Sequence, residues 1–408
     1  MSDVKISSGH EGNVRDQATA YLQRLKNGEM GALPAIGALI VVGALFSVLS
    51  PFFLGLLNFA NLFVQAAELT MLAVALVFVI LLGEIDLSAG VTAGVAMAGF
   101  YLLLHAGVNW IIALLVAFVI GGAIGAVIGF FVARIGVPSF VVTLGLFLGF
   151  QGLQLVMLGE GGIFRVDVPQ VSAIMNNNLP SWGGWAFLAL MLVLSAAVSL
   201  WDRRRRARHD LTNRPIELLV AKLVAFAVLG GITVFLLNQD RSKGLVAIAG
   251  VPIVIPITVM ILFIGTLVLD RTQFGRHLYA VGGNPEAARR AGIKVANIRI
   301  TAFIICSMLA VVSGLFHVSR IGNVEAGAGR QIVLNGVAAA VVGGVSLFGG
   351  RGRLVHAAIG AFVIVMIENG LGLLEFPAGV NLVVTGAVLI LAATIDALSR
   401  KRSSGTRS

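Results

Sequence analysis

The chain has 408 residues, of which 58% are hydrophobic and only 12% are charged, and its mean hydropathy is +0.97. This composition excludes a soluble globular domain and indicates a polytopic membrane protein. The net charge of +10 does not indicate nucleic-acid binding, because the basic residues lie in short clusters between long apolar runs. The single cysteine, Cys306, excludes an internal disulfide and a cysteine-based metal cluster.

Residues 1–31 are polar, and no cleavable signal peptide is expected, because the first apolar run starts late and is long enough to span a membrane. The apolar runs that follow predict an all-α polytopic membrane protein with about 10 to 12 transmembrane helices. We expect a cytoplasmic N-terminal segment at 1–31, a transmembrane domain at 32–398 and a cytoplasmic basic tail at 399–408. The candidate spans are 33–53, 59–82, 86–104, 109–133, 138–158, 184–201, 223–238, 246–269, 298–318, 333–349, 354–374 and 379–397.

Small residues distinguish several of these spans. Gly121, Gly125 and Gly129 recur every fourth residue within one apolar run, a spacing that favours close helix packing in lipid. The spans at 86–104 and 333–349 are short and interrupted by small residues, so a full crossing and a re-entrant segment both stay open for each of them.

The positive-inside rule gives the orientation. Loops on one side are rich in Lys and Arg, which places both termini and the loop at 270–297 in the cytoplasm. The opposite loops carry fewer basic residues, although Arg241, Lys243, Arg320 and Arg330 weaken the contrast. The cytoplasmic basic residues are Arg134, Arg203 to Arg206, Arg208, Arg214, Arg271, Arg276, Arg289, Arg290, Lys294, Arg351, Arg353 and the tail from Arg400.

Acids and amides at membrane depth mark a candidate solute path. A charged acid at the bilayer centre costs about 2.5 to 3.5 kcal/mol, so such groups should face protein or water and could hydrogen-bond the hydroxyls of a polar solute. Polar contacts between helices, or a loop end at the interface, explain the same pattern equally well, and a proton relay is a weaker option. The candidate path residues are Glu84, Asp86, Ser88, Asn335, Glu368 and Asn369.

The stretch from Asn335 to Gly352 is weakly similar to VILLGEIDLSAG, because both have an apolar run followed by glycine, a hydroxyl residue and glycine. This order suggests an internal repeat of the kind found in many transporters, with the solute path between the halves.

The cytoplasmic stretch from Thr272 to Val295 contains the signals of a short helix. Asn284 suits the N-cap, Pro285 the first helical position and Gly292 a left-handed stop. A helix of about two turns is marginal in water, so its flanks or a partner must hold it. The alternative is a well-capped loop that joins two membrane helices.

The sequence contains no GxxxxGK[ST], HExxH or GxSxG motif, and its histidines lack metal-ligand spacing. We therefore expect no enzyme activity, no metal and no cofactor on this chain. If ATP drives transport here, its hydrolysis belongs to another subunit.

Four motifs, in order and spacing, resemble the permease subunits of bacterial ATP-binding cassette importers for monosaccharides, over about residues 33 to 400. They are EIDLSAG at 84–90, PSFVVTLG at 138–145, FGRHLYAVGGNPEAARRAGIKV at 274–295 and GGVSLFGGRG at 343–352. Within the ribose, xylose and galactose branch, the glutamate of EIDLS and the extra segment at about 202–245 favour xylose permeases. One departure is VLNGVAA at 333–339, where the family usually reads ELDAIAA.

This resemblance implies a permease that imports a monosaccharide across the bacterial plasma (inner) membrane. It implies a cytoplasmic ATPase that holds ATP and magnesium, a periplasmic or lipid-anchored sugar-binding protein, a second permease copy and surrounding lipid, with no nucleic acid. The alternatives are an ion-coupled secondary transporter or channel, and a membrane scaffold or intramembrane enzyme. The residues implied in ATPase coupling are Gly275, Arg276, Gly283, Asn284, Pro285, Glu286, Ala287, Ala288, Arg289 and Gly292.

Overall fold

The computed structural model describes residue 31, residues 33–159, 161–209 and 215–242, residue 244, and residues 247–327 and 329–405. The polar segment 1–30, Arg214 and Lys243, which contributed to the predicted orientation, lie outside the described residues. The chain divides into two compact units, one formed by Gly31–Asn177 and Pro252–Leu398, and the other built on Asn178–Val251. The limits predicted for the transmembrane domain stay a prediction.

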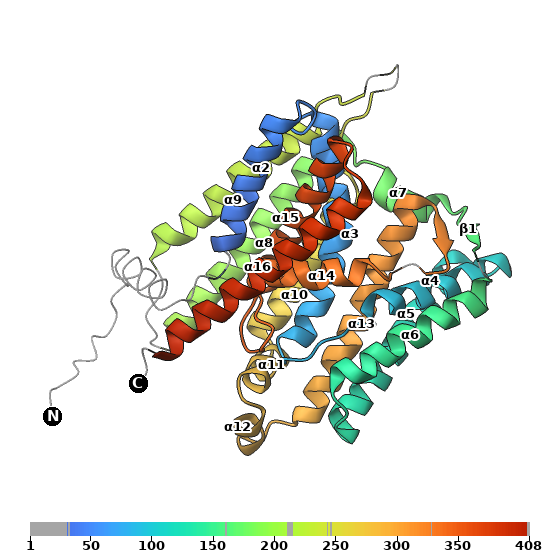
Figure 1. The fold of residues 1–408 in the computed structure, drawn as a ribbon. Helices are drawn as coiled ribbons and strands as arrows, with labels where there is room; N and C mark the ends of the chain where they lie inside the picture. Colours follow the sequence, from blue (N-terminus) through green and yellow to red (C-terminus); the bar gives the residue numbers. More distant parts are fainter. Residues whose placement is uncertain are drawn as a thin grey trace. The chain divides into compact units, whose positions relative to one another are not determined.

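The larger unit contains most of the helices (Figure 1). Their bounds are α2 Leu33–Leu49, α3 Leu56–Ile80, α4 Ala89–His105, α5 Trp110–Phe130 with the π-helical turn η1 Phe131–Ile135, α6 Ser139–Leu158, α7 Pro169–Asn176, α10 Val254–Arg271, α11 Gln273–Gly283, α12 Pro285–Arg290, α13 Val295–Ile321, α14 Ile332–Val342, α15 Leu354–Leu373 and α16 Ala378–Gly405.

The smaller unit contains α8 Ser181–Ala207 and α9 Ile216–Leu237. Every predicted span thus corresponds to a helix, and in the part of the chain that the structure describes eight helices are long and apolar enough to cross a membrane. The predicted all-α polytopic membrane fold is confirmed.

The core of the larger unit surrounds α3, which packs against α10, α13, α14 and α15. Side chains from Leu72 to Leu81 are almost completely buried, on every side of the helix. An apolar helix that is buried all round belongs to the centre of a bundle rather than to its lipid-facing surface.

The glycine repeat in α5 serves helix packing, as predicted. A Cβ added at Gly125 would lie 2.5 Å from the carbonyl oxygen of Phe303, and one at Gly129 would lie 2.7 Å from Cα of Ile300. The backbones of α5 and α13 therefore approach each other at positions where only glycine fits.

Two backbone breaks interrupt the larger unit, at residues 81–88 between α3 and α4 and at residues 343–353 between α14 and α15. With 11 residues, α14 rises about 17 Å and cannot cross a hydrocarbon core of about 30 Å. The span predicted at 333–349 ends early because Gly344, Gly349, Gly350 and Gly352 adopt positive φ angles, which stop a helix. The two breaks contain the two stretches whose weak similarity suggested a repeat.

The sequence analysis did not predict the short elements β1, β2 and α7. Strand β1, Ile163–Arg165, pairs antiparallel with β2, Asn323–Glu325, and α7 follows β1. Strands of three residues are too short for a periodic pattern. The span predicted at 246–269 begins only at Val254, because Gly250 at φ +101° and Pro252 keep the preceding backbone out of a helix.

In the smaller unit α8 and α9 pack antiparallel, with Gly184 against Val234 and Gly230 against Leu188. The loop after α9 is held by Arg241, which is buried although it lies on the side predicted to be poor in basic residues. Its guanidinium donates to the carbonyl oxygens of Leu237 and Gly250 at 2.5 and 3.0 Å and to Asn178 Oδ1 at 2.8 Å. This arginine therefore has a structural role, which accounts for one exception to the charge pattern.

Candidate functional site

The connection between α10 and α13 forms two capped helices. α11 begins after Thr272, whose hydroxyl accepts a hydrogen bond from the amide of Gly275 at 3.2 Å. α12 begins after Asn284, whose Oδ1 accepts from the amide of Ala287 at 2.9 Å, and Gly292 follows it at φ +84°. The short capped helix predicted here is confirmed. The sequence prediction treated α11 as loop.

Most of α12 faces solvent. Ala288 is its one buried residue, whereas the Glu286 carboxylate pairs with Arg289 at 3.0 Å and with Arg290 at 3.5 Å, all three side chains being at least 58% exposed. Such exposed pairs contribute only about 0.2 to 0.5 kcal/mol each to helix stability. The charged groups of α12 are therefore available to a partner.

α11 lies directly on the two backbone breaks. A Cβ at Gly282 would overlap the carbonyl oxygen of Leu81 and would lie 2.9 Å from the amide nitrogen of Gly350. The Tyr279 hydroxyl donates to the carbonyl oxygen of Gly352 at 2.7 Å. The connection therefore contacts both breaks directly, through backbone groups and the Tyr279 hydroxyl.

The remaining residues implied in coupling divide into anchored and exposed positions. Gly275 is buried against the end of α10, where a Cβ would overlap the carbonyl oxygen of Leu269. Arg276 is exposed and donates to the carbonyl oxygen of Arg271 at 3.4 Å, and a Cβ added at Gly283 would meet no atom within 4 Å. Pro285 and Ala287 are also exposed.

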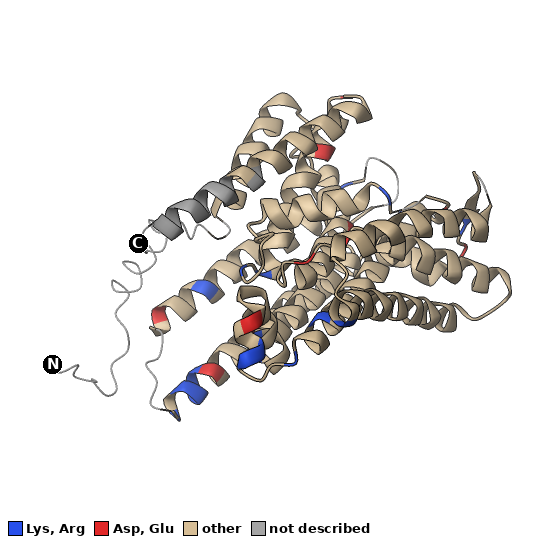
Figure 2. Cartoon of the chain, turned by 60° about the horizontal axis from the view of Figure 1, so that its bottom comes forward, with Lys and Arg blue, Asp and Glu red and all other residues tan. Residues whose placement is uncertain are grey.

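Basic residues from three loops of the larger unit lie at the end where α12 lies, which we call the α12 end. The Arg134 guanidinium, in η1, donates to Asn297 Oδ1 at 3.4 Å in the first turn of α13. Arg351 follows Gly350, which packs against Gly283. Figure 2 shows Lys and Arg in loops and near helix ends, whereas the long helices are mostly uncharged along their length. Three loops predicted to share one side of the membrane thus meet at one end of this unit.

Glu84 lies at the α12 end. Its carboxylate is 3.3 Å from the guanidinium of Arg299, near the start of α13, and the two side chains are 13% and 26% exposed. The expectation that this acid faces protein rather than lipid is confirmed.

Asp86 is fully buried beneath the start of α4. Its Oδ1 accepts hydrogen bonds from the Ser88 amide at 2.9 Å and from the Ser88 hydroxyl at 2.6 Å, and the Cys306 thiol lies 3.7 Å from Oδ2. Asp86 thus provides a hydrogen-bond acceptor for a backbone amide that lies in the protein interior just ahead of the helix. The role of Glu84, Asp86 and Ser88 in a solute path stays a prediction.

The other predicted path residues form two polar pairs. The Asn335 amide on α14 donates to Glu368 Oε1 on α15 at 2.7 Å. Asn369 and Asn58 exchange two amide hydrogen bonds, each of 2.9 Å, between α15 and α3. These contacts link helices, which is the alternative that the sequence left open, and Val333 in the same segment is buried.

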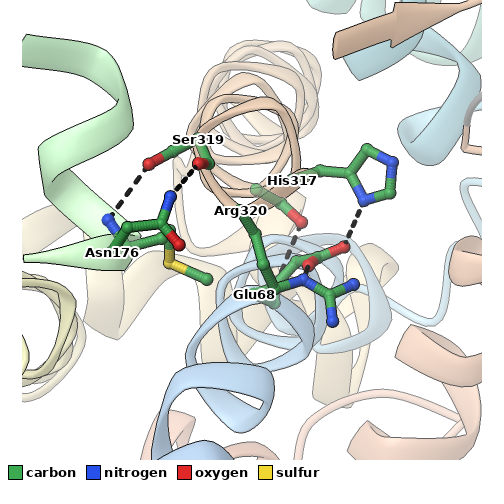
Figure 3. A network of polar contacts seen from close by, with 7 residues as sticks. Glu68, Asn176, His317, Ser319 and Arg320 are labelled. Atoms are coloured by element: carbon green, nitrogen blue, oxygen red, sulfur yellow. Dashed lines mark hydrogen bonds and ion pairs between the residues drawn. The ribbon is translucent and has the colours of Figure 1, made fainter. Parts of the chain in front are cut away.

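A polar cluster on α3 and α13 was not predicted (Figure 3). The Glu68 side chain is only 4% exposed, and its Oε1 lies 2.8 Å from His317 Nδ1 while its Oε2 lies 2.9 Å from Arg320 Nε. The hydroxyl of Ser313 donates to the backbone oxygen of Glu68 at 3.0 Å. Through Ser319, whose backbone oxygen accepts from the Asn176 amide at 2.7 Å, the same end of α13 also holds α7.

Beside this cluster is a cavity of about 560 Å³ between α4, α13, β2 and the start of α14. One wall is made of small or apolar residues, including Gly90, Ala93 and Met97. Its size is typical of sites for small molecules, which lie between about 300 and 1,000 Å³. The polar lining residues are Ser313, His317, Asn323, Glu325, Arg330 and Gln331.

Comparison with known proteins identifies the family. The model of the family described as branched-chain amino acid transport system / permease component matches residues 58–393. The chain belongs to this permease family. It is 34% identical over 384 residues to the xylose transport system permease protein XylH of Escherichia coli (strain K12), covering 93% of this chain and 95% of that protein.

Two further relatives also match over most of the chain. Identity is 31% to XylH of Haemophilus influenzae, covering 93% of this permease and 99% of that protein. Identity is 29% to the ribose import permease protein RbsC of Escherichia coli (strain K12), covering 88% of this permease and 91% of that protein. No solved structure was found to match the permease.

One feature of the sequence could have indicated the cluster of Glu68, His317 and Arg320. Glu68 is an acid inside the long apolar run of α3, the same criterion that selected Glu84 and Asp86. His317 and Arg320 lie near the end of the α13 run, where a basic residue is ordinarily read as an interfacial anchor. Their convergence depends on the packing of α3 against α13, which no local pattern reveals.

The permease thus has a cavity and the exposed helix α12 at opposite ends of α13. Figure 1 shows α11 and α12 at one end of this helix and α7 with β1 at the other. Arg299 near its start bonds the first break, and His317 near its end lines the cavity. A rigid helix that contacts both regions can couple a change at one to a change at the other.

Proposed function

We propose that this permease is the membrane-spanning subunit of an ATP-binding cassette importer that moves a monosaccharide inward, xylose being favoured over ribose- or galactose-type sugars. The observation that carries the proposal is α12, a capped and exposed charged helix fixed at its base to both backbone breaks. The similarity to a xylose permease at 34% identity and to a ribose permease at 29% identity supports the substrate class.

Alternating access requires partners that this chain does not supply. We infer that α12 docks on a cytoplasmic ATPase, which binds ATP and magnesium, and that a periplasmic or lipid-anchored binding protein delivers the sugar. A second copy of the permease and the surrounding lipid complete the membrane assembly. The permease has no catalytic role of its own and binds no nucleic acid in this proposal.

The orientation follows from the charge pattern. We propose a multi-pass protein of the bacterial plasma (inner) membrane with α12 and both termini in the cytoplasm. The basic loops that meet at the α12 end support this orientation. In the smaller unit, Arg203 to Arg206 lie at the opposite end of the antiparallel pair from Arg241, as the same rule requires.

The test is reconstitution of the permease with candidate ATPase and binding protein in liposomes. We expect co-purification of the three proteins, ATP hydrolysis stimulated by xylose-loaded binding protein, and ATP-dependent xylose uptake exceeding that of ribose or galactose. The matched control contains an ATPase that binds but does not hydrolyse ATP. Uptake without any ATPase would favour the ion-coupled transporter, whereas assembly without flux of any solute would favour a scaffold.

A further inference from the structure

The His317 imidazole is held in one orientation by the acid behind it. A carboxylate accepts hydrogen bonds but does not donate them, so the His317 Nδ1 that lies 2.8 Å from Glu68 Oε1 must carry the proton. In the neutral ring, Nε2 is then an acceptor. Figure 3 shows the ring with Nδ1 toward Glu68 and its opposite edge turned away from the carboxylate.

The charge of Glu68 is paired within the cluster, by Arg320. Its second oxygen pairs with Arg320 at 2.9 Å, so that the buried acid and the arginine neutralise each other behind the cavity wall. The ring of His317, 27% exposed, lines the cavity itself. The cavity therefore receives the edge of the His317 ring that faces away from Glu68, in a fixed orientation.

The remaining lining groups indicate the chemistry of a ligand. Glu325 and Arg330 contribute one charge of each sign, while Ser313, Asn323 and Gln331 provide neutral donors and acceptors. Met97 and small residues such as Gly90 and Ala93 form an apolar part of the lining. Balanced charge, several neutral polar groups and an apolar wall suit an uncharged solute that carries many hydroxyls and a C–H face.

We propose that this cavity binds an uncharged polyhydroxyl solute, with His317 Nε2 accepting a hydroxyl proton and Glu68 as the residue that positions the ring. The inference rests on the proposed function and deepens it by naming the group that recognises the sugar. In the alternative, the cluster only ties α3 to α13, and the exposed edge of His317 has no ligand.

The two amide substitutions of His317 separate these roles. The side-chain amide of asparagine lies as many bonds from Cα as Nδ1, so His317→Asn keeps a donor for Glu68 and removes the group at Nε2. The amide of glutamine reaches the position of Nε2, so His317→Gln restores an acceptor on the cavity side. His105→Asn is the matched control, because the His105 ring stacks on Tyr101 with centroids 5.9 Å apart and does not line the cavity.

The experiment measures binding of radiolabelled D-xylose and xylitol to the purified full-length permease in lipid nanodiscs, without ATPase or binding protein. We expect the parent protein to bind both compounds saturably and not to bind D-xylonate. Binding of D-xylose and xylitol should be at least tenfold weaker in His317→Asn, should partly recover in His317→Gln and should not change in His105→Asn. Thermal unfolding of each variant should match the parent protein. Uptake in the reconstituted system should show the same order in KM.

Binding that is unchanged in His317→Asn, or absent in the parent protein, would overturn the cavity proposal even if uptake is normal. A second outcome is that both His317 variants lose binding and unfold at a lower temperature, with no recovery in His317→Gln. This result would show that the cluster has only a structural role. Failure of sugar uptake in the complete system would instead count against the proposed function, since binding to the isolated permease does not require the ATPase.

Discussion

The amide of Gly350 donates a hydrogen bond to the carbonyl oxygen of Leu81 at 2.8 Å, and this contact joins the two backbone breaks of the larger unit. Gly282 of α11 packs against the same pair of groups. Three segments that are far apart in sequence therefore meet through their backbones, without a side chain between them. A junction of this kind is stiff, since little can shift to absorb a displacement.

We predict that Gly282→Ala disrupts this junction. The added Cβ would overlap the Leu81 carbonyl oxygen, so α11 must move or the break must open, at a cost of at least about 1 to 3 kcal/mol. Thermal unfolding of the purified protein should occur at a lower temperature, and sugar-stimulated ATPase activity of the complex should fall. Gly283→Ala is the matched control, because a Cβ at this neighbouring glycine has open space. Equal behaviour of the two variants would show that the junction is not tight.

The Tyr279 hydroxyl gives the junction a dependence on alkaline pH. Burial and, to a smaller extent, the charge of Asp270 raise the pKa of Tyr279 from 10 to about 12, with Arg353 opposing the shift. Because the folded state holds this proton more tightly than the unfolded chain, the stabilisation is complete below pH 10 and is lost as pH rises towards about 12. We expect Tyr279→Phe to reduce stability by about 0.5 to 1.5 kcal/mol near neutral pH.

The measurement is the unfolding temperature of parent and variant across that pH window. The difference between them should shrink from pH 10 to pH 12. A constant difference between parent and Tyr279→Phe over the window would contradict the role of this hydroxyl.

Local signals predicted some of these features and could not predict others. α12 was predictable because its start and stop are set by Asn284 and Gly292, whose effects act within one helical turn. The interrupted spans were visible as runs of small residues. Close glycine contacts, such as that of Gly282 with Leu81, could not be predicted. In the sequence, a glycine that must approach another backbone looks the same as a glycine that ends a helix.

The candidate site shows the same limit. Asp86 and Glu68 are both acids within or beside long apolar runs, yet Asp86 accepts hydrogen bonds from Ser88 just ahead of α4, whereas Glu68 contacts His317 beside a cavity. Which of these roles an acid has depends on residues more than 200 positions away. Sequence position alone therefore identifies buried acids but does not assign them to a solute path.

Arg241 should be indispensable to the loop that follows α9. It is buried and donates to two backbone oxygens and one amide, so Arg241→Gln leaves acceptors unpaired and should destabilise this loop by about 1.5 to 3 kcal/mol. Hydrogen exchange should become faster at the amides of Gly250 and Leu179, which bond across the same loop. Arg205→Gln, at an exposed position, is the control and should leave both amides protected.

The last prediction concerns Glu286 on α12. Because this carboxylate is 58% exposed, its pairs with Arg289 and Arg290 contribute little, and Glu286→Lys should leave the isolated permease folded with an unchanged unfolding temperature. At an interface with the proposed ATPase the same change reverses a charge, where like-charge contact costs several kcal/mol. Association with the ATPase should therefore weaken at least tenfold, and uptake should be lost.

Glu217→Lys provides a matched control, since Glu217 is also an exposed acid in the first turn of a helix and also follows shortly after a proline. Both substitutions place a lysine near the positive end of a helix, at a similar small cost in each. Only the substitution in α12 should affect ATPase binding, which is measured by co-purification and by titration of the ATPase onto permease in nanodiscs. If Glu286→Lys keeps parental ATPase affinity and uptake, and Gly292→Pro is equally silent, the α10–α13 connection is a linker and transmits nothing to the membrane helices.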